Sequence, residues 1–172
     1  MKLSRTVLAA VGGLLIAGPA LANACIRPDE RSALEVRSLQ TYLMVSALNC
    51  QRGESYNQFV RRFGSELTSA NRTSDAYFRR AHGGQGRTRF DSHNTNLANE
   101  HSEDAIRAGS FFCRDAEALF QQALSTPGPQ LAQFAVQRNI PQSTTADDCG
   151  AAGPTAATAA RRAVTRTSSR RR

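Results

Sequence analysis

Four cysteines follow the apolar segment that opens the chain, and that segment itself contains none. An even number of cysteines in a short chain with an export signal predicts a disulfide framework. Two disulfides would tie together regions that are far apart in the sequence, so they restrict the possible folds more than any other feature. The cysteines are Cys25, Cys50, Cys113 and Cys149.

Residues 1–24 have the pattern of a secretory signal peptide. The segment combines a basic start, an apolar stretch over residues 7–16 and a small-x-small site at residues 20–22. We expect cleavage after Ala22 or Ala24 and a periplasmic or secreted mature chain. The apolar stretch is too short for a stable membrane span, so we expect no integral membrane segment in the mature protein.

A lipid anchor on Cys25 is an alternative, because a cysteine directly after a bacterial signal can be acylated. The preceding Ala22-Asn23-Ala24 lacks the leucine that usually stands three positions before such a cysteine. Lipidation would also leave three cysteines, which is an odd number for disulfides. We therefore favour two disulfides.

The formal net charge of +8 is concentrated at the C-terminus. Residues 25–149 contain 14 arginines and 14 acidic residues, whereas residues 150–172 contain six arginines and no acidic residue. The latter segment has no aromatic residue, and its composition predicts a disordered tail after a single domain of residues 25–149. The tail arginines, which could contact an anionic lipid or polymer, are Arg161, Arg162, Arg166, Arg170, Arg171 and Arg172.

Apolar residues recur at helical spacing throughout the predicted domain. The clearest case is residues 55–80, where Tyr56, Phe63, Ala70 and Tyr77 recur every seven residues and predict one long helix. Glycines at 83, 84 and 86 are expected to end it. Further helices are expected over residues 28–49, from about residue 90 to the break at 109–110, over 112–123, and briefly around 131–135. The sequence thus predicts an all-α fold, an antiparallel bundle of four to five helices.

The helix order favours one disulfide pairing among the three that four cysteines permit. Cys50 ends the first predicted helix and Cys113 begins the fourth, and alternating helix directions would bring these two points to the same end of a bundle. Cys25 and Cys149 would then tie the two ends of the domain together. We expect disulfides Cys50–Cys113 and Cys25–Cys149.

The residues that most resemble a chemical site are His93 and His101, with Glu100 and Asp91 nearby. A weak metal site is conceivable there, but structural zinc usually has histidines four residues apart or cysteine ligands. Buried or interfacial histidines are the favoured interpretation. The chain contains no Cys-x-x-Cys, Gly-x-Ser-x-Gly or His-Glu-x-x-His motif, and we predict no catalytic residue, no metal and no cofactor.

Several segments resemble small exported proteins of unknown function from Gram-negative bacteria. The similarity lies in residues 39–50 (LQTYLMVSALNC), residues 56–63 (YNQFVRRF), Leu97-Ala98-Asn99 and Phe112-Cys113, and it covers about residues 25–124. It implies a secreted helical domain with no assigned activity. The arginine-rich tail is not part of the pattern.

Three functional hypotheses follow. The leading hypothesis is a non-enzymatic interaction or envelope-maintenance module with a protein partner in the cell envelope. The second is an envelope enzyme or metal-binding protein with a site between helices near His93, Glu100 and His101. The third is a binder of anionic surfaces that acts through the arginine-rich tail.

Overall fold

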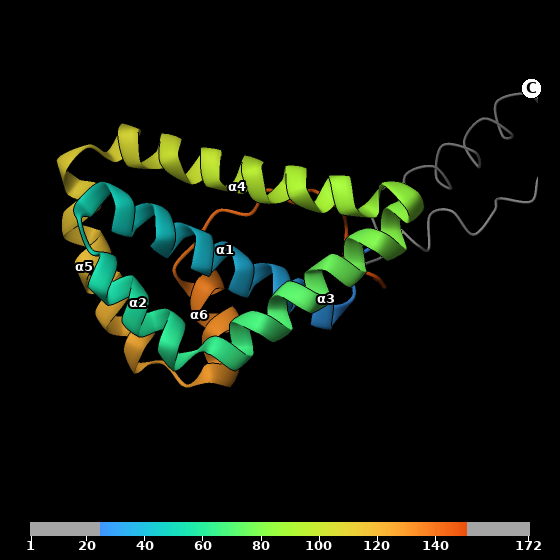
Figure 1. Cartoon of the computed structure of the whole chain (residues 1–172), viewed down its shortest axis with the longest axis horizontal. Helices are drawn as coiled ribbons and strands as arrows, with labels where there is room; N and C mark the ends of the chain where they lie inside the picture. The colour runs from blue at the N-terminus through green and yellow to red at the C-terminus, as the bar shows by residue number, and fades with distance from the viewer. Residues whose placement is uncertain (1–24, 151–172) are drawn as a thin grey trace, which may run out of the picture.

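The computed structural model describes residues 25–150, which form helices joined by short connections (Figure 1). The all-α prediction is confirmed: within these residues the only β feature is one isolated bridge between Ile26 and Asp148. The predicted signal peptide and residues 151–172 lie outside the described part. The α-helices are α1 (Pro28–Cys50), α2 (Gly53–Arg62), α3 (Gly64–His82), α4 (Gly86–Ala108), α5 (Ser110–Ser125) and α6 (Leu131–Gln137).

Helix α1 is the centre of the fold and packs against each of the other five α-helices. Leu34, Leu39 and Leu43 are fully buried, and residues on other faces of the helix are buried as well. A helix buried on most sides must satisfy its polar groups internally. Thr41 and Ser46 do so by donating their hydroxyl hydrogens to the carbonyls of Arg37 and Tyr42, one turn earlier.

The prediction of one helix over residues 55–80 is wrong, because the chain bends at Phe63. Its backbone (φ −112°, ψ 24°) leaves the helical region, so α2 ends at Arg62 and α3 starts at Gly64. The bend lets Phe63 enter the core beside Phe59, with 5.1 Å between the ring centroids. Phe63, Ala70 and Tyr77 are all buried, so the seven-residue spacing continues through the bend and hides it. With this division the described residues contain six α-helices, of which α6 is a short one of 7 residues.

The other predicted helix limits agree with the structure within a few residues. A 3₁₀ turn, Gly83–Gln85, separates α3 from α4, and Gly109, with φ of +56°, separates α4 from α5. Gly86 is required for close packing, because a Cβ atom there would lie 2.5 Å from the Cα of Arg79. These glycines set the positions at which α4 begins and ends. A second 3₁₀ turn, Gly128–Gln130, precedes α6.

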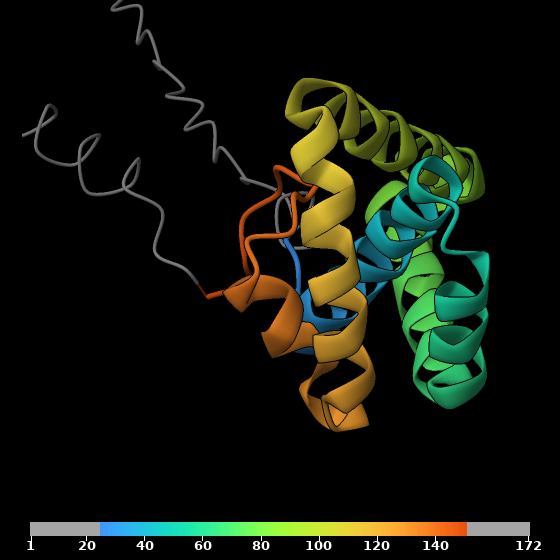
Figure 2. The ribbon, with the colours of Figure 1, turned by 90° about the vertical axis from the view of Figure 1, so that its left-hand side faces the viewer.

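The helices place the two ends of α1 in different surroundings. In Figure 1, α1 and α4 run in the same direction from right to left, while α2 and α3 return along a bent path. Figure 2 views the left-hand end, where the C-terminal ends of α1 and α4 lie near the start of α5. None of the described helices is long and apolar enough to cross a membrane.

The buried apolar side chains form two clusters. The larger includes Leu39, Leu43, Phe63, Phe120 and Leu131 and joins α1, α2, α3, α5 and α6. The smaller lies where α1 and α4 begin and α3 ends, and consists of Ile26, Leu34, Tyr77, Phe78 and Phe90. The smaller cluster is directly beside the first and last cysteines of the domain.

Candidate functional site

Two disulfides close the described domain at its two ends. Cys25 is bonded to Cys149, and Cys50 is bonded to Cys113, which is the pairing favoured from the sequence. Because the sulfur of Cys25 is used in a disulfide, this structure is not compatible with a lipid on that residue. Cys25 and Cys149 are 124 positions apart in the sequence, and Cys50 and Cys113 are 63 positions apart. The two bonds lie in different regions of the domain, and each region has its own surface.

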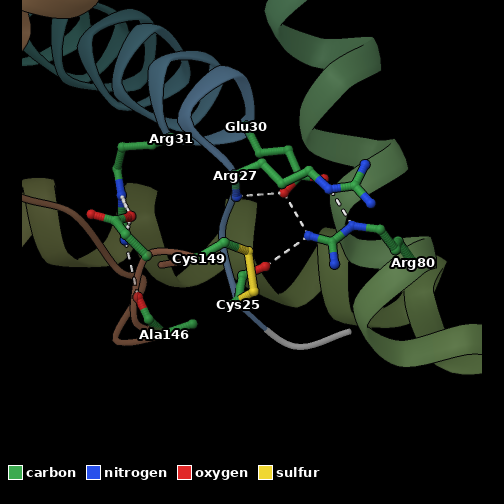
Figure 3. Close-up of a disulfide and its surroundings, with 8 residues drawn as sticks. Cys25, Arg27, Glu30, Arg31, Arg80, Ala146 and Cys149 are labelled. Carbon is green, nitrogen blue, oxygen red and sulfur yellow. Dashed lines mark hydrogen bonds and ion pairs between the residues drawn. A yellow bond between two sulfur atoms is a disulfide. The ribbon is translucent and has the colours of Figure 1, made fainter. Parts of the chain in front are cut away.

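The end closed by Cys25–Cys149 is held by a buried ion pair (Figure 3). Arg80 on α3 donates hydrogen bonds to both carboxylate oxygens of Glu30, at 2.9 and 2.5 Å, and to the carbonyl of Cys25 at 2.7 Å. The Glu30 side chain is only 5% exposed and that of Arg80 is 18% exposed. Glu30 also accepts a hydrogen bond from the backbone N–H of Arg27, which precedes α1. One carboxylate thus joins the start of α1 to the end of α3.

The surroundings of Glu30 favour its charged form. Burial alone would raise the pKa of this carboxyl, but hydrogen bonds from Arg80 and Arg27 and the charge of Arg80 lower it below its ordinary value. The Arg80 guanidinium is held charged by the same pair. This arrangement indicates a structural clamp, because the groups of the pair are already engaged with each other.

Residues 140–149 form a strap that runs from α6 to Cys149 and is fastened by side chains of α1 and α4. The carbonyl of Pro141 accepts hydrogen bonds from Ser38, at 2.5 Å, and from the Nε2 of His101, at 3.2 Å. Further along, the backbone of Ile26 exchanges two hydrogen bonds with Asp147 and Cys149. Further hydrogen bonds hold the strap. Gln142 donates to Glu35, Ser143 donates to Glu100, and Arg31 donates to Ala146 and Asp148.

The three residues of the proposed enzyme or metal site have separate partners. His93 is buried against the ring of Phe78, with 5.0 Å between centroids. His101 is fully buried beside Tyr42 and faces the strap. Glu100 is exposed and accepts a hydrogen bond from Ser143. Across residues 25–150, no group of three or more His, Cys, Asp or Glu side chains is arranged to hold a metal ion.

Burial lowers the pKa of both histidines and therefore favours their neutral forms. For His93, the charge of nearby Arg37 lowers the pKa further, against a smaller opposing effect of Glu100. For His101, the contact with Pro141 and the charges of Asp104 and Glu100 oppose the effect of burial without cancelling it. Arg37 is itself held by Gln40 and by Asn94 of α4, so the α1–α4 interface is polar as well as apolar.

The end closed by Cys50–Cys113 is different, because large apolar side chains are exposed there. Leu48 stands two residues before Cys50, Phe111 two residues before Cys113, and Ile106 at the end of α4. Their exposed fractions are 75%, 60% and 79%, respectively. We refer to these three residues as the apolar corner.

Charged residues around the apolar corner are paired at the surface. Arg107 bonds to Glu103 and Asp104, and Arg114 bonds to Asp115 and lies over the ring of Phe111. Arg52 pairs with Glu117 at 3.1 Å. The rim of the corner therefore combines both signs of charge.

Sequence reasoning did not identify the apolar corner. Leu48 and Phe111 lie off the helical stripes used to predict the core, and this off-stripe position was the available signal. The strap was also missed, because it has neither helical nor alternating periodicity. The predicted tail arginines lie outside the described residues, so the structure gives them no position.

Three arginines of α2 and α3 form ion pairs with acidic side chains. Arg61 pairs with Glu54 at 2.8 Å, Arg79 with Asp75 at 2.8 Å, and Arg80 with Glu30.

Comparison of the chain with protein-family models, with curated proteins and with solved structures gives no match. Function must therefore be inferred from the residues themselves.

Proposed function

We propose that this protein is an exported, non-enzymatic interaction module that uses its apolar corner to bind a protein of the cell envelope. The observation that carries the proposal is the exposure of Leu48, Ile106 and Phe111 at the end closed by Cys50–Cys113. Single exposed apolar residues are common on protein surfaces. Three large ones on segments that lie near one end of the domain are a stronger indication of a contact surface.

The composition of the corner fits the centre and rim of a protein interface. Interface centres are enriched in aromatic and aliphatic side chains and depleted in charge, whereas rims are polar. Phe111 is the expected anchor, because aromatic residues contribute much of the binding energy when they enter a pocket on a partner. The paired charges of Arg107 and Arg114 would favour a partner whose rim has no strong net charge.

Export is supported by two features of the chain. The first is the signal-like sequence of residues 1–24, which lies outside the described structure. The second is that all four cysteines are used in disulfides, as expected in an oxidising compartment. Together they favour a periplasmic or secreted location and an envelope partner.

Photo-crosslinking in cells that produce the protein tests this proposal. A crosslinker at position 110, beside Phe111, should capture one main partner, and the variant Leu48→Ser/Ile106→Ser/Phe111→Ser should lose that product. The matched control is Val136→Ser, which removes an apolar residue that is 56% exposed on α6. Capture that persists in the triple variant, or that is lost equally in the control, would contradict the proposal.

A second candidate function is supported by the charge distribution. Six arginines without acidic neighbours in residues 150–172 would attract an anionic lipid surface, by about 1 kcal/mol per arginine close to it, and this attraction decreases with salt. Co-sedimentation with phosphatidylglycerol vesicles should be lost when these residues are deleted. Replacement of Arg170, Arg171 and Arg172 by glutamine should reduce it partly. Equal binding of full-length and truncated protein would rule out the tail as the cause.

A further inference from the structure

A groove separate from the apolar corner lies between α5, the end of α6 and the beginning of the strap. It consists of two adjoining hollows of about 330 and 450 Å³, which share Tyr42, Arg138 and Ile140. The first hollow extends along α5 past Ala116 and Leu119. The second extends toward Phe112 and the end of α4. These volumes are within the range of small-molecule sites.

The groove combines an apolar wall with one available cation. Ile140, Phe112 and Leu119 are between 5% and 7% exposed and form the apolar part. The guanidinium of Arg138 lies 5.7 Å from the ring centroid of Phe134. No acidic side chain within residues 25–150 forms an ion pair with Arg138, although the residue is exposed.

The acidic residues of the groove are already paired. Asp104 bonds to Arg107 in the second hollow, and Asp115 bonds to Arg114 beside the first. These two pairs offset part of the negative charge that would repel an anion, although both carboxylates still act on the Tyr42 hydroxyl. Among the described residues that line the groove, Arg138 is the one charged side chain without an ion-pair partner, so an anionic group would gain most by binding next to it.

Tyr42 supplies a hydrogen-bond donor at the point shared by the two hollows. Its ring is held between His101 and Phe112, with centroid distances of 5.2 and 5.6 Å. Burial, together with the charges of Asp104 and Asp115, raises the pKa of the Tyr42 hydroxyl. The hydroxyl therefore keeps its proton at neutral pH and can donate it to an acceptor.

We propose that this groove binds a small carboxylate that carries an apolar chain. Its carboxylate would accept hydrogen bonds from Arg138 and Tyr42, and its chain would lie along Leu119 and Ile140. Arg138 selects negative charge, and the hydroxyl adds a directional donor beside it. The site goes beyond the proposed protein-binding function, because Tyr42, Arg138 and Ile140 are not among the three residues of the apolar corner and the ligand is of a different kind.

Three probes with the same chain length test the charge preference: hexanoate, hexylamine and hexanol. In ¹H–¹⁵N NMR titrations of the disulfide-bonded protein at low salt, hexanoate should give saturable shifts at Tyr42, Leu119 and Ile140. We expect hexylamine and hexanol to bind at least tenfold more weakly. Raising the salt concentration should weaken hexanoate binding, because it screens the charge of Arg138.

Two variants and one control locate the site. Arg138→Gln should reduce hexanoate affinity at least tenfold, and Tyr42→Phe should reduce it less, because one donor is lost and the charge is kept. Arg61→Gln, which removes an exposed arginine on α2, should leave affinity unchanged. The absence of saturable shifts with hexanoate, equal binding of hexylamine, or unchanged affinity in a folded Arg138→Gln variant would each overturn the proposal.

Discussion

The two ends of the domain use the same covalent bond in opposite surroundings. At Cys25–Cys149 the bond lies among a buried ion pair, a backbone bridge and the strap, and Ile26 beside it is fully buried. At Cys50–Cys113 the neighbouring apolar side chains are exposed and the ion pairs lie at the surface. The first end uses its polar groups for internal contacts, whereas the second leaves apolar area available to a partner.

This contrast shows that a disulfide does not by itself identify the role of a region. A disulfide reduces the conformational freedom of the unfolded chain wherever it lies, so both bonds contribute to stability. What distinguishes the two ends is whether the surrounding groups have found partners within the protein. Substitutions at the two ends should therefore differ in their effects on stability.

Removing Cys25–Cys149 should cost more stability than removing Cys50–Cys113. The first bond closes a loop of 124 residues and the second a loop of 63, which correspond to about 5 and about 4 kcal/mol in the chain-entropy treatment. Loss of the first bond should also loosen the strap. Urea unfolding of Cys25→Ser/Cys149→Ser and Cys50→Ser/Cys113→Ser measures both values. A larger loss in the second variant would reverse the contrast.

Removing one member of the buried ion pair should be costly only at the Cys25–Cys149 end. Arg80→Met leaves the Glu30 carboxylate buried without its cation and should destabilise the fold by about 3 to 5 kcal/mol. Arg52→Met, near the other end, breaks a pair whose side chains are 47% and 39% exposed, and should cost less than about 1 kcal/mol. The comparison uses the same substitution and the same urea assay. Similar losses would show that burial of the pair is not the deciding factor.

Truncation of a phenylalanine to alanine should have different effects in the core and in the apolar corner. Phe63→Ala leaves a cavity beside Phe59 and should cost about 3 to 5 kcal/mol, because Phe63 is only 2% exposed. Phe111→Ala should change stability by less than about 0.5 kcal/mol, since the ring is 60% exposed, yet it should reduce capture of the envelope partner. An unchanged unfolding midpoint for Phe63→Ala would place that ring outside the core. A strong destabilisation by Phe111→Ala would give the corner a structural role.

The smallest predicted effect is a pH dependence of the free energy of unfolding that is caused by His101, which lies beside the strap. The pKa of His101 is lowered in the folded protein, so below its ordinary value of about 6.5 the unfolded chain binds a proton that the folded chain does not. Stability should therefore decrease as pH falls from 7.5 to 5.5, by at most about 1.4 kcal/mol per pH unit for this residue. His101→Gln should reduce that decrease, whereas His82→Gln, at an exposed position, should not.

Unfolding by urea at the two pH values supplies the measurement for each variant. Glu35, whose pKa is raised by burial, acts in the opposite direction, but it is present in all the proteins compared. The difference between wild type and variant therefore isolates the histidine. An identical pH response in wild type and His101→Gln would refute the assignment.

Most of the helical framework was predictable because local patterns determine it. The periodic apolar residues and the glycines at 83, 86 and 109 gave the helix limits, and the helix order favoured the cysteine pairing. The bend at Phe63 was missed because Phe59, Phe63 and Leu67 keep a helical spacing across it. A change in the backbone conformation of one residue that preserves the apolar stripe leaves no trace in the pattern.

The candidate sites were much less predictable, because they depend on contacts between distant segments. Tyr42 and Arg138 are far apart in the sequence and meet only after α6 and the strap pack against α1 and α5. The ion pair between Glu30 and Arg80 likewise joins two helices. Periodicity can predict which residues face inward, but it does not show which polar groups will find a partner within the fold.

The long loop closed by Cys25–Cys149 has a consequence for biosynthesis. A chain that emerges N-terminus first presents Cys25 and Cys50 to an oxidant before either native partner is available. Bonding between them would be non-native and would have to be reversed by thiol–disulfide exchange. Correct pairing of Cys25 must wait for the emergence of Cys149, almost at the end of the domain. The yield of native protein should therefore depend on disulfide isomerisation as well as on oxidation.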